Sequence, residues 1–132
     1  MPKSIAKFFF VLYFSNFCPI FGQTAVDSME GELRKCIELA ESQEKSSDIC
    51  YKTALRKLDL RLNTLYQSIY SNLPKKDKLN FKNAQRKWLS FRDADAVFRK
   101  QFDEDFALEF AYQELRGRVM DLECIITNNH WD

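Results

Sequence analysis

Apolar side chains recur every three or four residues through most of the chain, which is the spacing of amphipathic α-helices. The clearest run lies in the middle of the chain and comprises Tyr51, Leu55, Leu58, Leu62, Leu65, Ile69 and Leu73. Pro74 follows this run and is expected to end the helix. No segment has the alternation of a half-buried β-strand. The pattern therefore predicts an all-α protein with one long central helix.

A shorter helix is expected before the central one, over about residues 28–43. Asp27 followed by Glu30 resembles a capping box at its start. Its apolar positions are Met29, Leu33, Cys36, Ile37 and Ala40. The polar residues 43–47 predict a turn, and Ser47 is the candidate cap of the central helix.

A third helix is predicted after Pro74, with Asp77 as its cap. Its apolar seam comprises Phe81, Ala84, Trp88, Phe91, Asp95, Phe98 and Phe102. Asp95 is the exception in this seam, because a buried carboxylate is costly unless it is paired and hydrogen-bonded. An arginine from a neighbouring helix, or a position near the rim of the core, would resolve that conflict.

A fourth helix is predicted from a new stripe, with Asp105 as its candidate cap. The stripe comprises Leu108, Tyr112, Leu115, Val119, Leu122 and Ile126. No glycine or proline separates this helix from the third one, so a single continuous helix is the competing interpretation. Short loops favour an antiparallel bundle of three long helices, with the shorter N-terminal helix laid across them. The 132 residues leave room for one domain.

The first residues resemble a secretory signal peptide. Lys3 and Lys7 precede an apolar run over residues 8–14, which is too short and interrupted for a membrane span. We expect cleavage after Gly22 or after Ala25, with a retained N-terminal anchor as the alternative. Cleavage after Gly22 leaves a single helical domain over residues 23–132 in the periplasm or outside the cell. That domain has 18 basic and 19 acidic side chains, so its net charge favours no class of partner.

The mature chain would retain Cys36, Cys50 and Cys124, and an oxidising compartment would pair two of them. Three pairings are open on the sequence alone. We favour a disulfide between Cys36 and Cys50, because the short stretch between them contains the predicted turn. A metal site is the weaker interpretation, since neither cysteine has a second ligand at zinc-type spacing and His130, the one histidine, lies in the C-terminal tail.

Charge gathers at two places once the helices are laid out. The start of the third helix, which we call the basic end, carries Lys75, Lys76, Lys78, Lys82, Arg86 and Lys87. The turn between the third and fourth helices, which we call the acidic end, carries Asp103, Glu104, Asp105 and Glu109. These ends should lie one helix length apart. Charge runs of this kind often mark only solvated helix ends that have no partner.

Signatures of catalysis are missing from the sequence. It contains no glycine-rich phosphate loop, nucleophile elbow or His-Glu-x-x-His pair, and it has only three glycines. His130 lies in a segment expected to be mobile, which makes it a poor general base. Phe81 and Trp88 fit the core seam, so they give nucleic-acid binding little support. The sequence predicts a non-enzymatic protein without a cofactor.

Trp88 and Arg92 are four residues apart and share a helix face, so the guanidinium can lie along the indole while it reaches a carboxylate. The neighbouring Asp93 could join Asn63 or Tyr66 of the central helix in a hydrogen-bonded cluster. We expect a network that fixes the register between the second and third helices, in preference to a ligand site.

These residues resemble the LprI-type lysozyme inhibitor family, which consists of small exported helical domains. The family pattern is a cysteine pair, then Asp-x-x-Leu-Asn-x-x-Tyr, Ala-Gln-x-x-Trp-Leu-x-Tyr-Arg-Asp and Glu-Leu…Arg-x-x-x-Leu. The resemblance covers residues 36–122, with Phe91 in place of the usual tyrosine. The matching residues are Cys36, Cys50, Asp59, Leu62, Asn63, Tyr66, Ala84, Gln85, Trp88, Leu89, Arg92, Asp93, Glu114, Leu115, Arg118 and Leu122.

The chain departs from the family pattern at two cysteines, whose places are taken by Ala96 and Ala111. Joint absence is expected if those cysteines bond each other, and the resemblance thereby supports pairing of Cys36 with Cys50. Cys124 would then be a leftover thiol.

The resemblance implies a protein that binds a lysozyme and blocks it without performing chemistry. Because common lysozymes are strongly basic, we expect contact at the acidic end. Asp103, Glu104 and Asp105 would steer association, and Phe106 would be an apolar anchor. The alternative is an envelope interaction module that binds anionic cell-wall polymers or a partner protein through the basic end, with Lys75, Lys76 and Lys78.

Overall fold

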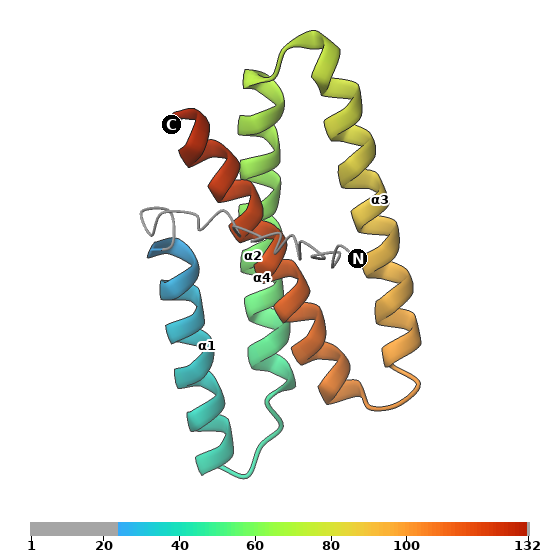
Figure 1. The fold of residues 1–132 in the computed structure, drawn as a ribbon. Helices are drawn as coiled ribbons and strands as arrows, with labels where there is room; N and C mark the ends of the chain where they lie inside the picture. The colour runs from blue at the N-terminus through green and yellow to red at the C-terminus, as the bar shows by residue number, and fades with distance from the viewer. Residues whose placement is uncertain (1–23, 132) are drawn as a thin grey trace, which may run out of the picture.

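Four α-helices account for nearly all of residues 24–131, the part of the chain that the computed structural model describes. They are α1 (Thr24–Ser42), α2 (Asp48–Asn72), α3 (Lys75–Arg99) and α4 (Glu104–Asn129). Figure 1 shows α2, α3 and α4 joined by short turns, with α1 the shortest helix. No strand occurs within this range. The predicted all-α fold with three long helices and a shorter first helix is confirmed, whereas the predicted signal peptide lies outside the described residues.

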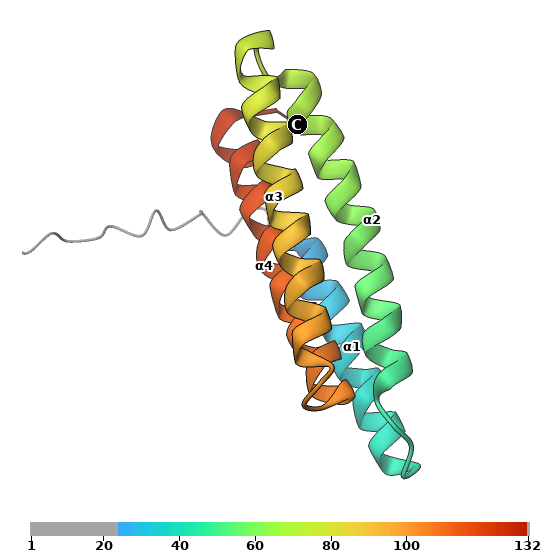
Figure 2. The same ribbon diagram turned by 90° about the vertical axis from the view of Figure 1, so that its right-hand side faces the viewer.

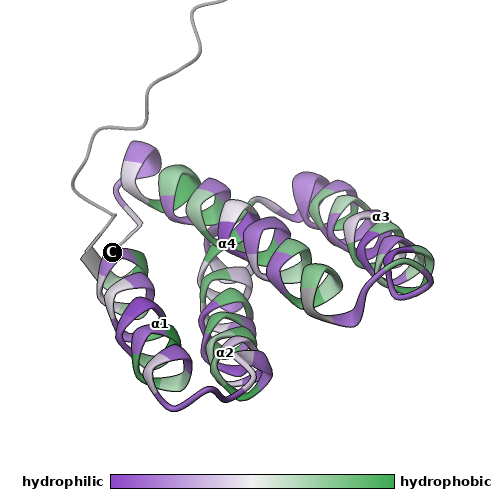
Figure 3. Ribbon diagram, turned by 90° about the horizontal axis from the view of Figure 1, so that it is seen from below, coloured by the Kyte–Doolittle hydropathy of each residue, from purple (hydrophilic) through white to green (hydrophobic). Residues whose placement is uncertain are grey.

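The core lies where α4 crosses α2. The α2 seam is buried at Leu58, Leu62, Leu65 and Ile69, as its spacing predicts. Opposite it, α4 buries Ala107, Tyr112, Leu115, Val119, Leu122 and Ile126. Seen from below, α1 and α3 lie on opposite sides of the α2–α4 pair (Figure 3). The α2–α4 pair is therefore the structural centre of the bundle.

α1 runs beside α2 and antiparallel to it, so it does not lie across the three long helices as expected (Figure 1). The buried residues on its inner face are Val26, Leu33 and Ala40. A disulfide joins Cys36 of α1 to Cys50 of α2, with 5.7 Å between the two Cα atoms. The favoured cysteine pairing is thus confirmed.

The expectation of a leftover thiol at Cys124 is wrong, because no cysteine of the described chain is free.

Two helices begin earlier than predicted. α1 already starts at Thr24, which places Asp27 in its first turn and rules out the predicted capping box there. Pro74 has an extended backbone (ψ 149°) and takes the cap position of α3, so Asp77 also lies in a first turn. A carboxylate in the first turn is stabilised by the helix dipole without being the cap, which explains why both aspartates resembled caps in the sequence.

The other two predicted caps also differ from the structure. Ser47 occupies the cap position of α2, but its side chain makes no capping hydrogen bond. At the start of α4 the cap is Asp103, two residues before the predicted Asp105. The Asp103 carboxylate accepts a hydrogen bond from the Phe106 backbone N–H at 3.1 Å. Asp103 can do so because its backbone is extended, with φ −164° and ψ 128°.

A turn separates α3 from α4, since α3 ends at Arg99 and α4 begins at Glu104. The interpretation of one continuous helix is therefore wrong. At the other end of α4, His130 adopts a left-handed backbone (φ 54°) and caps the helix. Trp131 then packs against the core. The last residues are thus fixed by the fold up to Trp131, contrary to the expectation of a mobile segment.

The predicted seam of α3 is only partly buried. Phe81 and Trp88 pack against the core, but Phe91, Phe98 and Phe102 are exposed. Gln85, with 7 % of its surface exposed, is the single α3 residue in the buried class. α3 therefore borders the core along its first half and leaves an aromatic stripe in solvent along its second half.

Asp95, the carboxylate in the α3 seam, is paired within its own helix. Arg99 Nε donates to Asp95 Oδ2 at 2.6 Å, four residues further along α3. Both side chains are about one-fifth to one-quarter exposed, so the pair sits at the rim of the core. The partner comes from the same helix and not from a neighbouring one.

Among residues 24–131, no helix is both long and apolar enough to cross a membrane.

Candidate functional site

The tryptophan–arginine–aspartate motif forms a network that connects α3 to α2. The Arg92 guanidinium lies over the Trp88 ring, 5.4 Å from its centroid. It donates to Asp93 at 2.9 and 3.0 Å, and at 3.4 Å to Asp59 of α2. One cation therefore links an indole and two carboxylates, as its spacing on α3 predicts.

A second arginine approaches the same indole from α4. Arg118 lies 5.7 Å from the Trp88 ring centroid and donates to Gln85 Oε1 at 2.8 and 3.0 Å. Burial lowers the pKa of the Arg118 guanidinium. These hydrogen bonds satisfy the buried Gln85 amide oxygen, and the two arginines fix α3 against both α2 and α4.

Asn63 and Tyr66 stay outside this network, contrary to expectation, because Asp93 is turned to Arg92. The Tyr66 ring instead stacks on Phe81 of α3, with 5.0 Å between ring centroids. Both residues line a groove between α2 and α3 of about 320 Å³, which we call the α2–α3 groove. The sequence motif thus contributes to two places, a structural network and the wall of a groove.

The acidic end combines carboxylates with exposed aromatic rings. Asp103 and Glu104 are exposed, and Phe106 follows them at the start of α4. Phe102, with 72 % of its surface exposed, contacts Phe98 at 5.1 Å between ring centroids. We use the name aromatic–acidic end for the surface formed by Phe98, Phe102 and Phe106 with Asp103 and Glu104. Phe98 and Phe102 were assigned to the core by their spacing, and this is how sequence reasoning missed them as surface residues.

A cation–aromatic contact between α3 and α4 stabilises the aromatic–acidic end. The Arg99 guanidinium lies 3.2 Å from the centroid of the Phe110 ring in α4. Phe110 in turn lies 5.7 Å from Phe106, measured between ring centroids. Since Arg99 is also bound to Asp95, the last turn of α3 and the first turns of α4 are fixed relative to each other.

The basic end lies at the opposite end of α3. Lys75 and Lys76 are exposed, and Lys78 lies over the Tyr70 ring at 5.0 Å from its centroid. α3 has 25 residues. A helix of that length is roughly 36 Å long, which is far beyond the screening length at physiological salt. The two charged ends therefore act independently on any partner.

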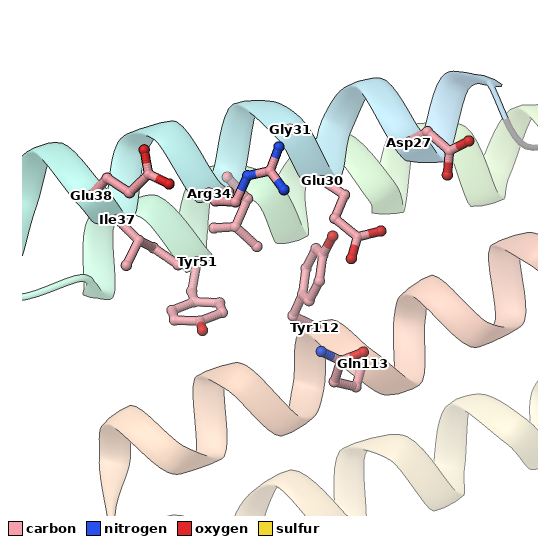
Figure 4. A pocket seen from close by; sticks show the side chains of 10 residues that line it. Asp27, Glu30, Gly31, Arg34, Ile37, Glu38, Tyr51, Tyr112 and Gln113 are labelled. Atoms are coloured by element: carbon pink, nitrogen blue, oxygen red, sulfur yellow. The ribbon is translucent and has the colours of Figure 1, made fainter.

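Another hollow lies between α1 and α4, with a volume of about 420 Å³. Figure 4 shows Tyr112 reaching from α4 toward α1 beside Glu30, with Asp27, Arg34 and Glu38 around it. Burial raises the pKa of Tyr112, and Glu30 raises it further. The Tyr112 hydroxyl is out of reach of solvent and has no hydrogen-bond partner in the part of the chain described. The charged side chains that line this hollow are three carboxylates, of Asp27, Glu30 and Glu38, and one guanidinium, of Arg34.

No group of three or more metal-binding side chains comes together among residues 24–131.

Comparison with known proteins gives one match. A family model described as "Lysozyme inhibitor LprI" matches residues 36–130. The match begins at the α1 cysteine of the disulfide and runs to the residue that caps α4, so it includes all of α2, α3 and α4. No curated protein and no solved structure matches the chain.

Proposed function

We propose a function from the premise that this chain belongs to the LprI lysozyme inhibitor family: it binds a lysozyme through the aromatic–acidic end and blocks it without catalysing a reaction. The observation that carries this proposal is the exposure of Phe98, Phe102 and Phe106 beside Asp103 and Glu104. We further propose that the protein acts in the periplasm or outside the cell after its signal peptide is removed.

Exposed aromatic rings in one place are the usual anchors of a protein–protein interface. Single exposed apolar residues are common on any surface, whereas clustered ones mark interaction sites. Phenylalanine rings that are already fixed by neighbouring rings lose little side-chain entropy when a partner covers them. The contacts of Phe98 with Phe102 and of Phe106 with Phe110 provide that order in the free protein.

The carboxylates around these rings match a basic partner. Asp103 and Glu104 are exposed, and neither forms an ion pair among the residues that the structure describes. Negative charge continues from here toward α1: Glu109 and Glu41 add to the burial that raises the pKa of Tyr51. A strongly basic lysozyme would be attracted to this side of the molecule, which raises the association rate.

Cell-wall lysis by a basic lysozyme is the direct test of this proposal. We expect the mature protein to inhibit lysis at micromolar concentration. The double substitution Phe102→Ser and Phe106→Ser removes two anchors and should weaken inhibition by about tenfold or more, because each buried aromatic anchor contributes on the order of 1–2 kcal/mol.

The matched control is Leu60→Ser with Leu79→Ser, two similarly exposed apolar residues in the middle of α2 and in the first part of α3. This control should leave inhibition within about twofold, as expected of residues outside an interface. Absence of inhibition by the unaltered protein at micromolar excess, or equal loss in both double variants, would remove the proposal.

A second candidate function uses the basic end to bind anionic envelope polymers or a partner protein. The observation in its favour is that Lys75, Lys76 and Lys78 occupy the first turn of α3, where the helix dipole disfavours cations. Replacing all three with glutamate should abolish retention on anionic cell-wall polymers. Unchanged retention would exclude this candidate, and the lysis assay tests the first candidate separately.

A further inference from the structure

We propose that the α2–α3 groove binds a small anionic sugar, a hydroxylated ring that carries a carboxylate or a phosphate group. The groove has a volume of about 320 Å³. That volume is at the lower limit for ligand pockets and fits a single sugar ring. The inference does not depend on lysozyme binding, because the groove lies along the middle of α3, between Lys82 and Arg92, whereas the aromatic–acidic end lies at the last turn of α3 and the start of α4.

The α3 wall of the groove supplies two cations for the anionic group. Lys82 and Arg86 are four residues apart and project from one helix face into the same groove. Neither side chain forms an ion pair with any described residue. Arg92 also lines the groove, but its guanidinium is already bound to Asp59 and Asp93. Lys82 and Arg86 are therefore the cations available to a carboxylate or a phosphate.

The α2 wall presents two amides that suit hydroxyl groups. Asn63 and Gln67 are also four residues apart, and both are exposed and line the groove. Neither side chain makes a hydrogen bond to another residue in the described range. Each amide offers one acceptor oxygen and two donor hydrogens, so a pair of them can hold two neighbouring hydroxyls, which both donate and accept.

The floor of the groove is apolar and held in place. Leu62 of α2 and Leu89 of α3 line it. Beside them, the Tyr66 ring is stacked between Tyr70 at 5.9 Å and Phe81 at 5.0 Å, measured between ring centroids. The C–H face of a sugar ring can pack on such a surface, and the fixed ring reduces the entropy lost on binding.

The network that fixes α3 leaves Asn63 available to a ligand. The network that fixes α3 uses Asp59, Gln85, Trp88, Arg92 and Arg118. Asn63 belongs to the same sequence motif as Asp59 but takes no part in the network, and its amide remains open to the groove. A ligand with hydroxyl groups can therefore bind the Asn63 amide by displacing water.

Titration with glucuronate and with glucose 6-phosphate tests the proposal, with binding followed by NMR chemical shifts of groove residues. We expect dissociation constants on the order of 1 mM, and the tighter of the two sugars identifies the preferred anion. Lys82→Gln with Arg86→Gln should weaken binding by about tenfold or more. Lys75→Gln with Lys76→Gln makes the same charge change outside the groove and should weaken binding by less than about twofold.

Asn63→Ala reports on the hydroxyl-binding wall and should weaken sugar binding by about fivefold while it leaves binding of inorganic phosphate unchanged. The proposal is overturned if neither sugar binds at about 20 mM, if neutral glucose binds as tightly as its 6-phosphate, or if inorganic phosphate does. The proposal is also overturned if the Lys75/Lys76 double variant weakens sugar binding as much as the Lys82/Arg86 double variant does. Inhibition of lysozyme should be the same with and without the sugar. The sugar-binding proposal and the lysozyme-binding proposal can therefore be disproved separately.

Discussion

α3 and α4 are nearly equal in length, at 25 and 26 residues, yet they contribute to the core in opposite ways. α4 buries six apolar side chains, among them Tyr112, Val119 and Leu122 of the central core. α3 has only Gln85 in the buried class. The apolar spacing along the two sequences is similar, so spacing alone does not separate a core helix from a peripheral one.

The difference follows from position in the bundle. α4 crosses α2 and has a further helix on each side, whereas α3 has neighbours along one side only (Figures 2 and 3). What holds α3 is a set of polar and cation–aromatic contacts around Trp88. The spacing of apolar residues thus predicts which face of a helix can pack against another helix. The arrangement of the other helices decides whether that face is buried.

The largest difference should appear when one apolar side chain is truncated in each helix. Leu122→Ala in α4 removes a fully buried side chain and should lower the free energy of unfolding by about 3–4 kcal/mol. Phe98→Ala in α3 removes a larger but exposed side chain and should cost less than about 1 kcal/mol. Urea unfolding measures both values, and similar losses in the two helices would contradict the comparison.

α3 should become part of the stable core if it is bonded covalently to α4. Ala96 of α3 and Ala111 of α4 line the same hollow of about 250 Å³. We expect Ala96→Cys with Ala111→Cys to form a disulfide and to raise the free energy of unfolding by about 2–3 kcal/mol, since it closes a loop of moderate length. Thiol titration and urea unfolding under oxidising conditions, with Ala96→Ser and Ala111→Ser as the control that keeps the native disulfide, check this. Free thiols after oxidation would show that the two side chains do not meet.

A smaller effect should come from the buried ion pair between α2 and α4. Arg61 Nε donates to the Glu123 carboxylate at 3.0 Å, and Glu123 is only 5 % exposed. Burial raises the pKa of the Glu123 carboxyl, and Arg61 counteracts this. Arg61→Ala leaves the carboxylate unpaired and should lower the free energy of unfolding by about 2 kcal/mol at pH 7. The loss is smaller than for a fully buried pair because Arg61 is partly exposed.

The pH dependence of that loss has a defined sign. A carboxyl whose pKa is raised by folding destabilises the folded state while it is ionised, and this penalty disappears as the pH falls below its pKa. The cost of Arg61→Ala should therefore shrink on acidification. Glu123→Gln added to Arg61→Ala removes the ionisable group, so the double variant should lose this extra pH dependence. A cost that stays constant between neutral and acid pH would show that Glu123 does not titrate as stated.

The smallest effect on stability should come from the exposed stripe itself. Phe98→Ser with Phe102→Ser should change the free energy of unfolding by less than about 1 kcal/mol, since both side chains are mostly in solvent. The same variant should lose lysozyme inhibition if the aromatic–acidic end is the binding surface. Thermal unfolding measures stability and the lysis assay measures inhibition, both on the same preparation. A large loss of stability would show that these rings are part of the core.

Much of this fold can be predicted from the sequence. The spacing of apolar residues predicts the existence of the four helices, and the α2 seam from Leu58 to Ile69 is buried as predicted. The disulfide between Cys36 and Cys50 is also confirmed. These features are local, because helical spacing and a short loop between cysteines do not depend on how distant segments pack.

The features that sequence reasoning missed depend on distant segments. Phe91, Phe98 and Phe102 have the spacing of a core seam, but no helix covers them. Arg118 reaches the Trp88 indole from α4, across the bundle, and only the family pattern singles out both residues. The binding role of the acidic end stays a prediction, because it concerns a partner and not the packing of the chain itself.

The bond between Cys36 and Cys50 has a consequence for proteolysis. It spans the exposed residues 43–46 between α1 and α2, the polar segment where a protease would cut most readily. A cut there leaves two fragments that stay covalently joined, and Val26 and Leu33 of α1 remain seated in the bundle. Nicked protein should therefore migrate as intact protein on a non-reducing gel and separate into two bands only after reduction.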